Sequence, residues 1–252
     1  MQETYDRTPA GAPGRLDTAI KLLGSHPDYE FVKAREATEE EILRAHGTRT
    51  LESVKQDYDS TQAGLLYQMA LLAAGGSIQT AEIAVQGEPA FGLVRPPGHH
   101  ASGDSYWGFC YFNNIAVSLL HLRAKGFIES AYILDFDLHT GDGNINILGD
   151  DPKFTIHNPR GNGDEQYLKD VKRSLDSAPD VDIIVASAGF DQYEDDWGSN
   201  ISTDAFRKIG RMMHEFAAER CEGRRYGLLE GGYNFEDLGK NVLAFCDGLG
   251  GA

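Results

Sequence analysis

Short apolar runs alternate with helix-like patterns along most of this chain. Four runs, at residues 90–94, 131–135, 182–188 and 226–229, are apolar at consecutive positions, which is typical of strands buried on both faces. Between and after them, residues 113–125, 164–175, 203–221 and 236–249 carry helical periodicity. Alternation of buried strands and helices predicts an α/β protein built around a parallel sheet.

The N-terminal part of the chain is expected to be helical. One helix is predicted near residues 15–23, and Thr38 with Glu41 has the spacing of a capping box that opens a second helix. Residues 60–85 form a long Ala- and Leu-rich stretch, with a possible break at Gly75 and Gly76. There is no internal repeat or long linker, so we expect a single domain over residues 1–252.

Composition narrows the function classes. The formal net charge of −16 argues against direct nucleic-acid binding and allows cationic ligands, although a solvated acidic surface is the commoner explanation. The three cysteines, Cys110, Cys221 and Cys246, are far apart, which indicates a reducing compartment. The sequence shows no secretory pattern and no apolar run of membrane-spanning length, so we expect a cytoplasmic protein without membrane contact.

Polar side chains follow the run at residues 131–135. Asp135, Asp137 and His139 occupy alternate positions, so on a strand they would share one side. Carboxylates are seldom fully buried unless a partner or a metal ion compensates them. This pattern suits a borderline divalent metal, while a loop with a capping Asp and a solvated His is the alternative interpretation.

The other predicted strands also end in functional groups. Residues 90–94 are followed by His99 and His100, residues 182–188 by Asp191, and residues 226–229 by two glycines and Tyr233. Each signal alone is compatible with a solvated loop. Because the carboxyl ends of parallel strands meet at one edge of the sheet, we expect these side chains to converge on one site.

Five segments in a fixed order carry a resemblance to a known family. They read RPPGHHA at 95–101, GFCYFNN at 108–114, DFDLHTGDGN at 135–144, SAGFD at 187–191 and LEGGYN at 229–234. The chain resembles the histone deacetylase family in its broad sense, which includes bacterial and archaeal deacetylases and acetylpolyamine amidohydrolases. The resemblance implies the arginase/deacetylase fold, with one parallel sheet of about eight strands between helical layers.

The resemblance also implies a metal centre. By position, Asp137, His139 and Asp191 would be the three ligands of a Zn²⁺ ion, with Fe²⁺ as an alternative. Three protein ligands that leave an open position are typical of a catalytic site. A structural K⁺ ion is a further expectation, held by Asp135 and by backbone carbonyls near Asp137 and His139, with Thr155 as a possible contributor.

The resemblance assigns catalytic roles as well. His99 and His100 would act as the tandem general base and acid, with Asp135 orienting the first imidazole and Asp142 the second. Tyr233 would donate its hydroxyl hydrogen to the substrate carbonyl as that oxygen becomes negative.

The binding site is expected to differ from that of relatives. Gly108 and Phe109 would form part of a narrow tunnel around an acyl-lysine-like chain. Position 140 is Thr, where the family usually has a second histidine, and the segment from Gly143 to Tyr167 lacks most of a long rim segment. We therefore expect a more open mouth, with specificity that is looser or is completed by a partner subunit in a homo-oligomer.

These features favour a metal-dependent deacetylase. Its substrate would be an acetylated lysine side chain or an acetylpolyamine. A catalytically silent acyl-amine binding protein on the same fold is an alternative hypothesis. An arginase-like ureohydrolase is a weaker one, because the extra aspartates that a second metal needs are replaced by Gly141 and Tyr193.

Overall fold

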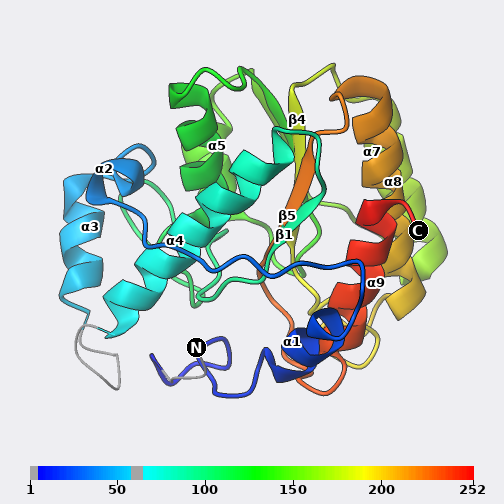
Figure 1. Ribbon diagram of the computed structural model, residues 1–252, viewed down its shortest axis with the longest axis horizontal. Helices are drawn as coiled ribbons and strands as arrows, with labels where there is room; N and C mark the ends of the chain where they lie inside the picture. The colour runs from blue at the N-terminus through cyan, green and yellow to red at the C-terminus, as the bar shows by residue number, and fades with distance from the viewer. Residues whose placement is uncertain (1–4, 58–64) are drawn as a thin grey trace.

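Five parallel strands form the centre of the structure, a computed structural model that describes residues 5–57 and 65–252 (Figure 1). The sheet has the order β1-β5-β4-β2-β3. The strands are β1 (Ala90–Gly92), β2 (Ala131–Asp135), β3 (Phe154–His157), β4 (Ile183–Ala188) and β5 (Arg225–Leu229). The α/β class and the parallel sheet predicted from the sequence are confirmed.

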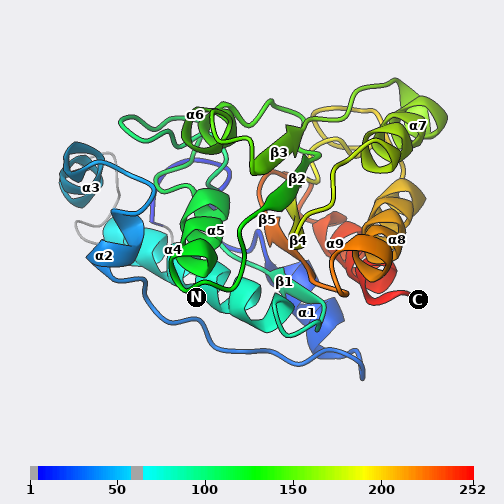
Figure 2. The ribbon, with the colours of Figure 1, turned by 90° about the horizontal axis from the view of Figure 1, so that it is seen from above.

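Helices cover both faces of this sheet. Figure 2 shows α4, α5 and α6 on one side and α7, α8 and α9 on the other. The helices are α1 (Asp17–Gly24), α2 (Glu39–Ile42), α3 (Thr48–Lys55), α4 (Leu65–Ala84), α5 (Asn114–Ala124), α6 (Asp142–Leu148), α7 (Gly163–Asp176), α8 (Thr203–Arg220) and α9 (Leu238–Gly250). The sequence patterns did not predict α3 and α6. The capping box at Thr38 and Glu41 is present.

Alternate residues of the strands pack into two separate apolar cores, one on each face of the sheet. In β2, Ile133 packs into the core under α4 and α5, whereas Tyr132 and Leu134 pack into the core under α7, α8 and α9. In β4, Val185 and Ile184 divide in the same way. Both faces of the sheet are therefore buried, which explains why these strands are apolar at consecutive positions.

The expectation of about eight strands is wrong for the residues that the structure describes, which form five. Other extended segments are present, but their backbones bind elsewhere. The segment before α2 lies along α4, where Ala37 N donates to Leu71 O. Tyr193 and Ile201 form only an isolated bridge.

The glycine pair in α4 allows a close approach and does not break the helix. A Cβ atom at Gly75 would lie 2.1 Å from Arg35 O, so only glycine lets the segment before α2 cross the helix there. The helix is continuous through Gly76. Residues 60–64 of the predicted helix lie outside the described part of the chain.

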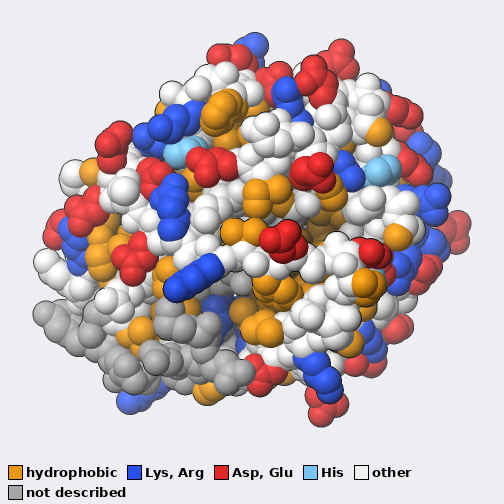
Figure 3. Space-filling model, in the orientation of Figure 1, with side chains coloured by type: hydrophobic (Ala, Val, Ile, Leu, Met, Phe, Trp, Pro, Cys, Tyr) orange, Lys and Arg blue, Asp and Glu red, His pale blue; other side chains and the backbone are white. Residues whose placement is uncertain are grey.

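The outer surface is mixed in charge. Figure 3 shows acidic and basic side chains interspersed over one face of the molecule. Among the described residues, no helix is both long and apolar enough to cross a membrane.

Candidate active site

Three side chains from two strand ends meet at the carboxyl edge of the sheet. Asp137 and His139 follow β2, and Asp191 follows the neighbouring strand β4. His139 Nδ1 lies 3.2 Å from Asp137 Oδ1 and 3.4 Å from Asp191 Oδ2. One potential ligand atom from each residue lies within 4.8 Å of the others. The three predicted ligands therefore form one cluster, called the metal cluster below.

Backbone groups fix the two carboxylates of the metal cluster. Gly231 N donates to Asp137 Oδ2 over 2.9 Å, and Leu138 N donates to Asp191 Oδ1 over 3.0 Å. A Cβ atom at Gly231 would lie 2.5 Å from Asp191 Oδ2 and 2.6 Å from Asp137 Oδ2. The glycine after β5 is therefore required for β5 to come this close to the cluster.

The chemistry of the metal cluster fits a divalent cation. Asp137 and Asp191 are buried, and Asp191 Oδ2 has no hydrogen-bond partner among the described residues. Burial, and after it the negative charge of Asp137, raises the pKa of Asp191 to about 6. Buried carboxylates in close contact are stable when a cation coordinates them, and two oxygens with one imidazole nitrogen suit a borderline metal.

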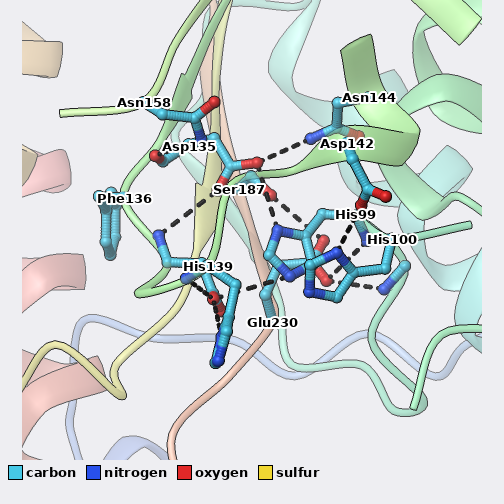
Figure 4. Close-up of polar contacts among 12 residues, drawn as sticks. His99, His100, Asp135, Phe136, His139, Asp142, Asn144, Asn158, Ser187 and Glu230 are labelled. Atoms are coloured by element: carbon cyan, nitrogen blue, oxygen red, sulfur yellow. Dashed lines mark hydrogen bonds and ion pairs between the residues drawn. The ribbon is translucent and has the colours of Figure 1, made fainter. Parts of the chain in front are cut away.

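The two adjacent histidines stand beside the metal cluster, each with its own carboxylate (Figure 4). His99 Nδ1 lies 3.3 Å from Asp135 Oδ2, and His99 Nε2 lies 3.6 Å from Asp137 Oδ1. His100 Nδ1 lies 2.6 Å from Asp142 Oδ1. The centroids of the two imidazole rings are 4.1 Å apart. The predicted pairing of each histidine with its aspartate is thus present in the geometry.

The environments of the two histidines differ. Burial lowers the pKa of His99, but Asp137 and Asp135 outweigh it and raise that pKa well above 6.5. Burial, and then the charge of His99, lowers the pKa of His100 despite the neighbouring Asp142. Two adjacent imidazoles with pKa values shifted in opposite directions are suited to an exchange of protons.

Trp107 completes the surroundings of His100. Its Nε1 donates to Asp142 Oδ2 over 2.9 Å, and its ring lies 4.1 Å from that of His100 at 33°. Gly108 also lies against His100, since a Cβ atom there would lie 2.4 Å from His100 Cδ2. His100 is therefore fixed by a carboxylate, an indole and a glycine.

Glu230 fixes the turn that carries the histidines. This buried residue follows β5, and its Oε2 accepts hydrogen bonds from Gly98 N (2.6 Å) and His99 N (3.1 Å). Burial raises the pKa of Glu230 to about 7. Glu230 also forms, with His99 and Cys110, a second group of potential ligand atoms. Its backbone hydrogen bonds indicate a positioning role.

Tyr233 lies at the mouth of the site, next to the second exposed tryptophan. The Trp197 ring stacks on Tyr233 at 4.0 Å and meets His139 edge-on at 6.4 Å. The buried Arg15 binds Gly232 O and Glu230 O, and its guanidinium lies 5.4 Å from the centre of the Tyr233 ring. Burial raises the pKa of Tyr233, which keeps its hydroxyl protonated as a donor.

The remaining predicted residues have clear places. The rings of Phe109 and Tyr233 meet edge-on with centroids 6.0 Å apart, and Phe109 has a φ of 66°, a strained backbone conformation. Thr140 is exposed beside His139. The expected K⁺ site stays a prediction; the carbonyl of Asp135 accepts a hydrogen bond from Asn158 Nδ2 over 3.1 Å.

A cavity of about 210 Å³ opens next to the metal cluster. Asp137, His139 and Thr140 form one wall, and residues 158–161 with Gln192 form another. Residues 158–161 follow β3 in the shortened segment, and the more open mouth expected there stays a prediction.

Several site residues were not assigned from the sequence. The side chains of Glu230 and Arg15 bind backbone atoms of distant segments, and no spacing pattern in the sequence reveals such contacts. Trp107 and Trp197 are the only tryptophans of the chain and both are more than half exposed, at 55% and 53%. The one signal available in the sequence was the position of Trp107 directly before the motif at 108–114.

Comparisons with known proteins show the family to which the chain belongs. A family model described as the histone deacetylase domain matches residues 10–158 and 153–249. A probable deacetylase from Methanothermobacter thermautotrophicus is 31% identical over 94% of this chain and 85% of its own length. The polyamine deacetylase HDAC10 of Danio rerio is 28% identical over 91% of this chain and 42% of its own length.

A solved structure shows the same fold. The crystal structure of the HDA15 HD domain has a TM-score of 0.83 and 25% sequence identity, and the match covers 97% of this chain and 85% of that one. The fold is therefore the predicted arginase/deacetylase fold, with the smaller sheet described above. The chain belongs to the histone deacetylase family.

Proposed function

We propose that this protein is a metal-dependent deacetylase that hydrolyses the acetyl amide of a lysine-like or polyamine amine. The observation that supports this most is one convergence of side chains. Asp137, His139 and Asp191 form a cluster with a buried oxygen that has no hydrogen bond among the described residues, and the histidine pair lies directly beside it. The relatives whose names describe deacetylases support the same reaction class.

Asp137, His139 and Asp191 would hold the ion, with Zn²⁺ preferred and Fe²⁺ as the alternative. A divalent ion there supplies Lewis acidity toward the amide carbonyl and makes a water molecule easier to deprotonate. His100, or the two histidines together, accepts the proton from the attacking water, and a protonated histidine then delivers a proton to the leaving amine. Asp135 and Asp142 keep each Nδ1 protonated, so that each Nε2 faces the reaction.

Tyr233 is assigned the role of donor to the developing oxyanion. Its protonated hydroxyl and its position at the mouth, held by Arg15 and Trp197, support that role. Glu230 holds the backbone of the histidine turn, so that the proton-transfer groups stay in place during the reaction.

The structure gives little support to the two alternatives. A ureohydrolase would need an aspartate at position 141, but a Cβ atom there would lie 2.0 Å from Asp135 Oδ2. Tyr193, at the other required position, is buried and donates to Asp195. A silent binding protein would not need the histidine pair with both of its aspartates.

A fluorogenic acetyl-lysine amide tests the proposal directly. We expect hydrolysis that stops on chelation and returns on addition of Zn²⁺ or Fe²⁺. Comparison of kcat/KM for acetyl-lysine peptides, acetylputrescine and acetylspermidine then shows which acetylated amine is preferred. Tight binding of these compounds without turnover in the metal-loaded protein would favour the silent binder.

A further inference from the structure

We propose that Arg160 and the cavity beside the metal cluster bind a carboxylate group of the amide substrate. This inference rests on the proposed amide hydrolysis and names its substrate class. The cavity is lined by two residues of the metal cluster, Asp137 and His139, so a group bound in it lies next to the reacting amide.

The cavity is lined by several hydrogen-bond donors that have no partner among the described residues. Arg160 lines it, and the structure gives its guanidinium no partner among the described residues. Gln192 is 94% buried, since its exposed fraction is 6%, and its Oε1 already accepts a hydrogen bond from Asn200. The amide NH₂ of Gln192 and the hydroxyl of Thr140 have no described partners either. Such a set suits an anion with several acceptor oxygens.

An unpaired arginine at this place is unexpected in so acidic a chain. Acidic residues outnumber Lys and Arg by 39 to 23, and Arg173 and Arg207 pair with Asp170 and Asp247 respectively. The carboxylate of Asp170 accepts a hydrogen bond from the backbone N of Arg160. It is already bound by His157 and Arg173, so it leaves the Arg160 side chain available.

The dimensions suit a short dicarboxylic acyl chain. A volume of 210 Å³ is many times the roughly 10–15 Å³ that one water molecule needs on the same measure, so the cavity can hold a chain of several heavy atoms. Arginine binds a carboxylate through two parallel hydrogen bonds, which sets orientation as well as affinity. The carboxylate can belong to the acyl side, as in succinyl-lysine, or to the amine side, as in a free acetylated amino acid.

A matched substrate panel separates these sources. The acyl arm compares Nε-acetyl-, Nε-butyryl- and Nε-succinyl-lysine coumarin amides, in which butyryl and succinyl have equal carbon number. The amine arm compares free Nε-acetyl-lysine with its carboxamide. Each substrate is tested with the metal-loaded wild type, Arg160→Gln and the control Arg211→Gln. The control removes an equal charge from an exposed position on α8.

We expect Arg160→Gln to lower kcat/KM at least tenfold for the carboxylate-bearing substrate of one arm. For the matched uncharged substrate, kcat/KM should change less than twofold. Arg211→Gln should leave kcat/KM unchanged for both substrates. Equal effects on charged and uncharged substrates, or no effect in either arm, would contradict the carboxylate site while leaving the deacetylase proposal intact. Absence of hydrolysis for every amide would instead remove the proposed function.

Binding of glutarate gives a readout that does not depend on turnover. Calorimetric titration of the metal-loaded protein should show an affinity at least tenfold weaker in Arg160→Gln than in wild type. An unchanged affinity, or no binding to wild type at millimolar glutarate, would overturn the proposal.

Discussion

Trp107 and His100 bind opposite oxygens of one carboxylate, that of Asp142, while their rings lie 4.1 Å apart. The indole of Trp107 therefore holds the imidazole of His100 in two ways, by direct ring contact and through the aspartate that both bind. Asp142 is half exposed, with 49% of its side chain accessible, so water would otherwise compete for it. We infer that Trp107 positions a proton-transfer group.

The substitution Trp107→Phe keeps a ring against His100 and removes the N–H donor. Because a hydrogen bond to a charged group contributes about 1.5–3 kcal/mol, we expect kcat to fall roughly 10- to 150-fold. Both KM and metal content should stay within twofold of wild type. A fall confined to KM would show that Trp107 acts on substrate binding and not on His100.

Tyr233→Phe tests the oxyanion donor. Removal of one such donor typically lowers kcat by about 100- to 1000-fold. The substitution leaves the metal cluster intact, so one equivalent of metal should remain bound. Full activity in this variant, measured on acetyl-lysine amide, would exclude the assigned role.

Asp191→Asn should have opposite effects on the metal-loaded and the metal-free protein. Loss of a ligand should lower bound metal from one equivalent to near zero after dialysis. In metal-free protein the substitution removes a buried charge that faces Asp137, so Tm should rise, by about 2–4 °C for each kcal/mol of repulsion relieved.

The control for this variant is Asp204→Asn, which removes an exposed carboxylate paired with Lys208. It should change neither metal content nor metal-free Tm by more than a degree or so. A metal-free Tm that falls in Asp191→Asn would show that the carboxylates are stabilised without a cation.

His46 should make the stability of the protein depend on pH. Its Nδ1 donates to Ser102 O and its Nε2 accepts from Asn113 N, so the ring must be neutral. Burial lowers its pKa from 6.5 to about 4. Between these values the unfolded chain binds more protons, so the free energy of unfolding falls as pH falls from 6.5 to 4, by roughly 3 kcal/mol.

Urea unfolding between pH 4 and 7 measures this dependence. The variant His46→Gln offers a donor and an acceptor but does not titrate. Its free energy of unfolding should therefore fall less than that of wild type as pH falls over this range. Identical pH profiles for the two proteins would contradict the account of His46.

The strand ends were predictable because their signals are local. β2 is apolar at residues 131–134 and is followed by alternating Asp and His, so both its burial and its chemistry could be inferred from adjacent positions. In a parallel sheet, the convergence with Asp191 and Tyr233 then follows from topology. The convergence of these strand ends was therefore accessible from the sequence, whereas the pairing of each histidine with its aspartate came from the family resemblance.

Contacts between distant segments were not accessible in this way. Glu230 reaches Gly98 across 132 positions, and Arg15 reaches Glu230 across 215. Gly75 was interpreted as a possible helix break because its function depends on the segment at Arg35 that crosses it. The cavity at Arg160 arises from the path of a shortened loop, which no periodicity describes.

The most direct test of the account is a titration of metal-depleted protein with Zn²⁺, with acetyl-lysine amide hydrolysis followed after each addition. We predict activity that rises linearly and reaches a plateau at one equivalent per chain, and no rise in Asp191→Asn. Hydrolysis that persists in the chelated protein, or a plateau at two equivalents, would contradict a single catalytic ion held by Asp137, His139 and Asp191.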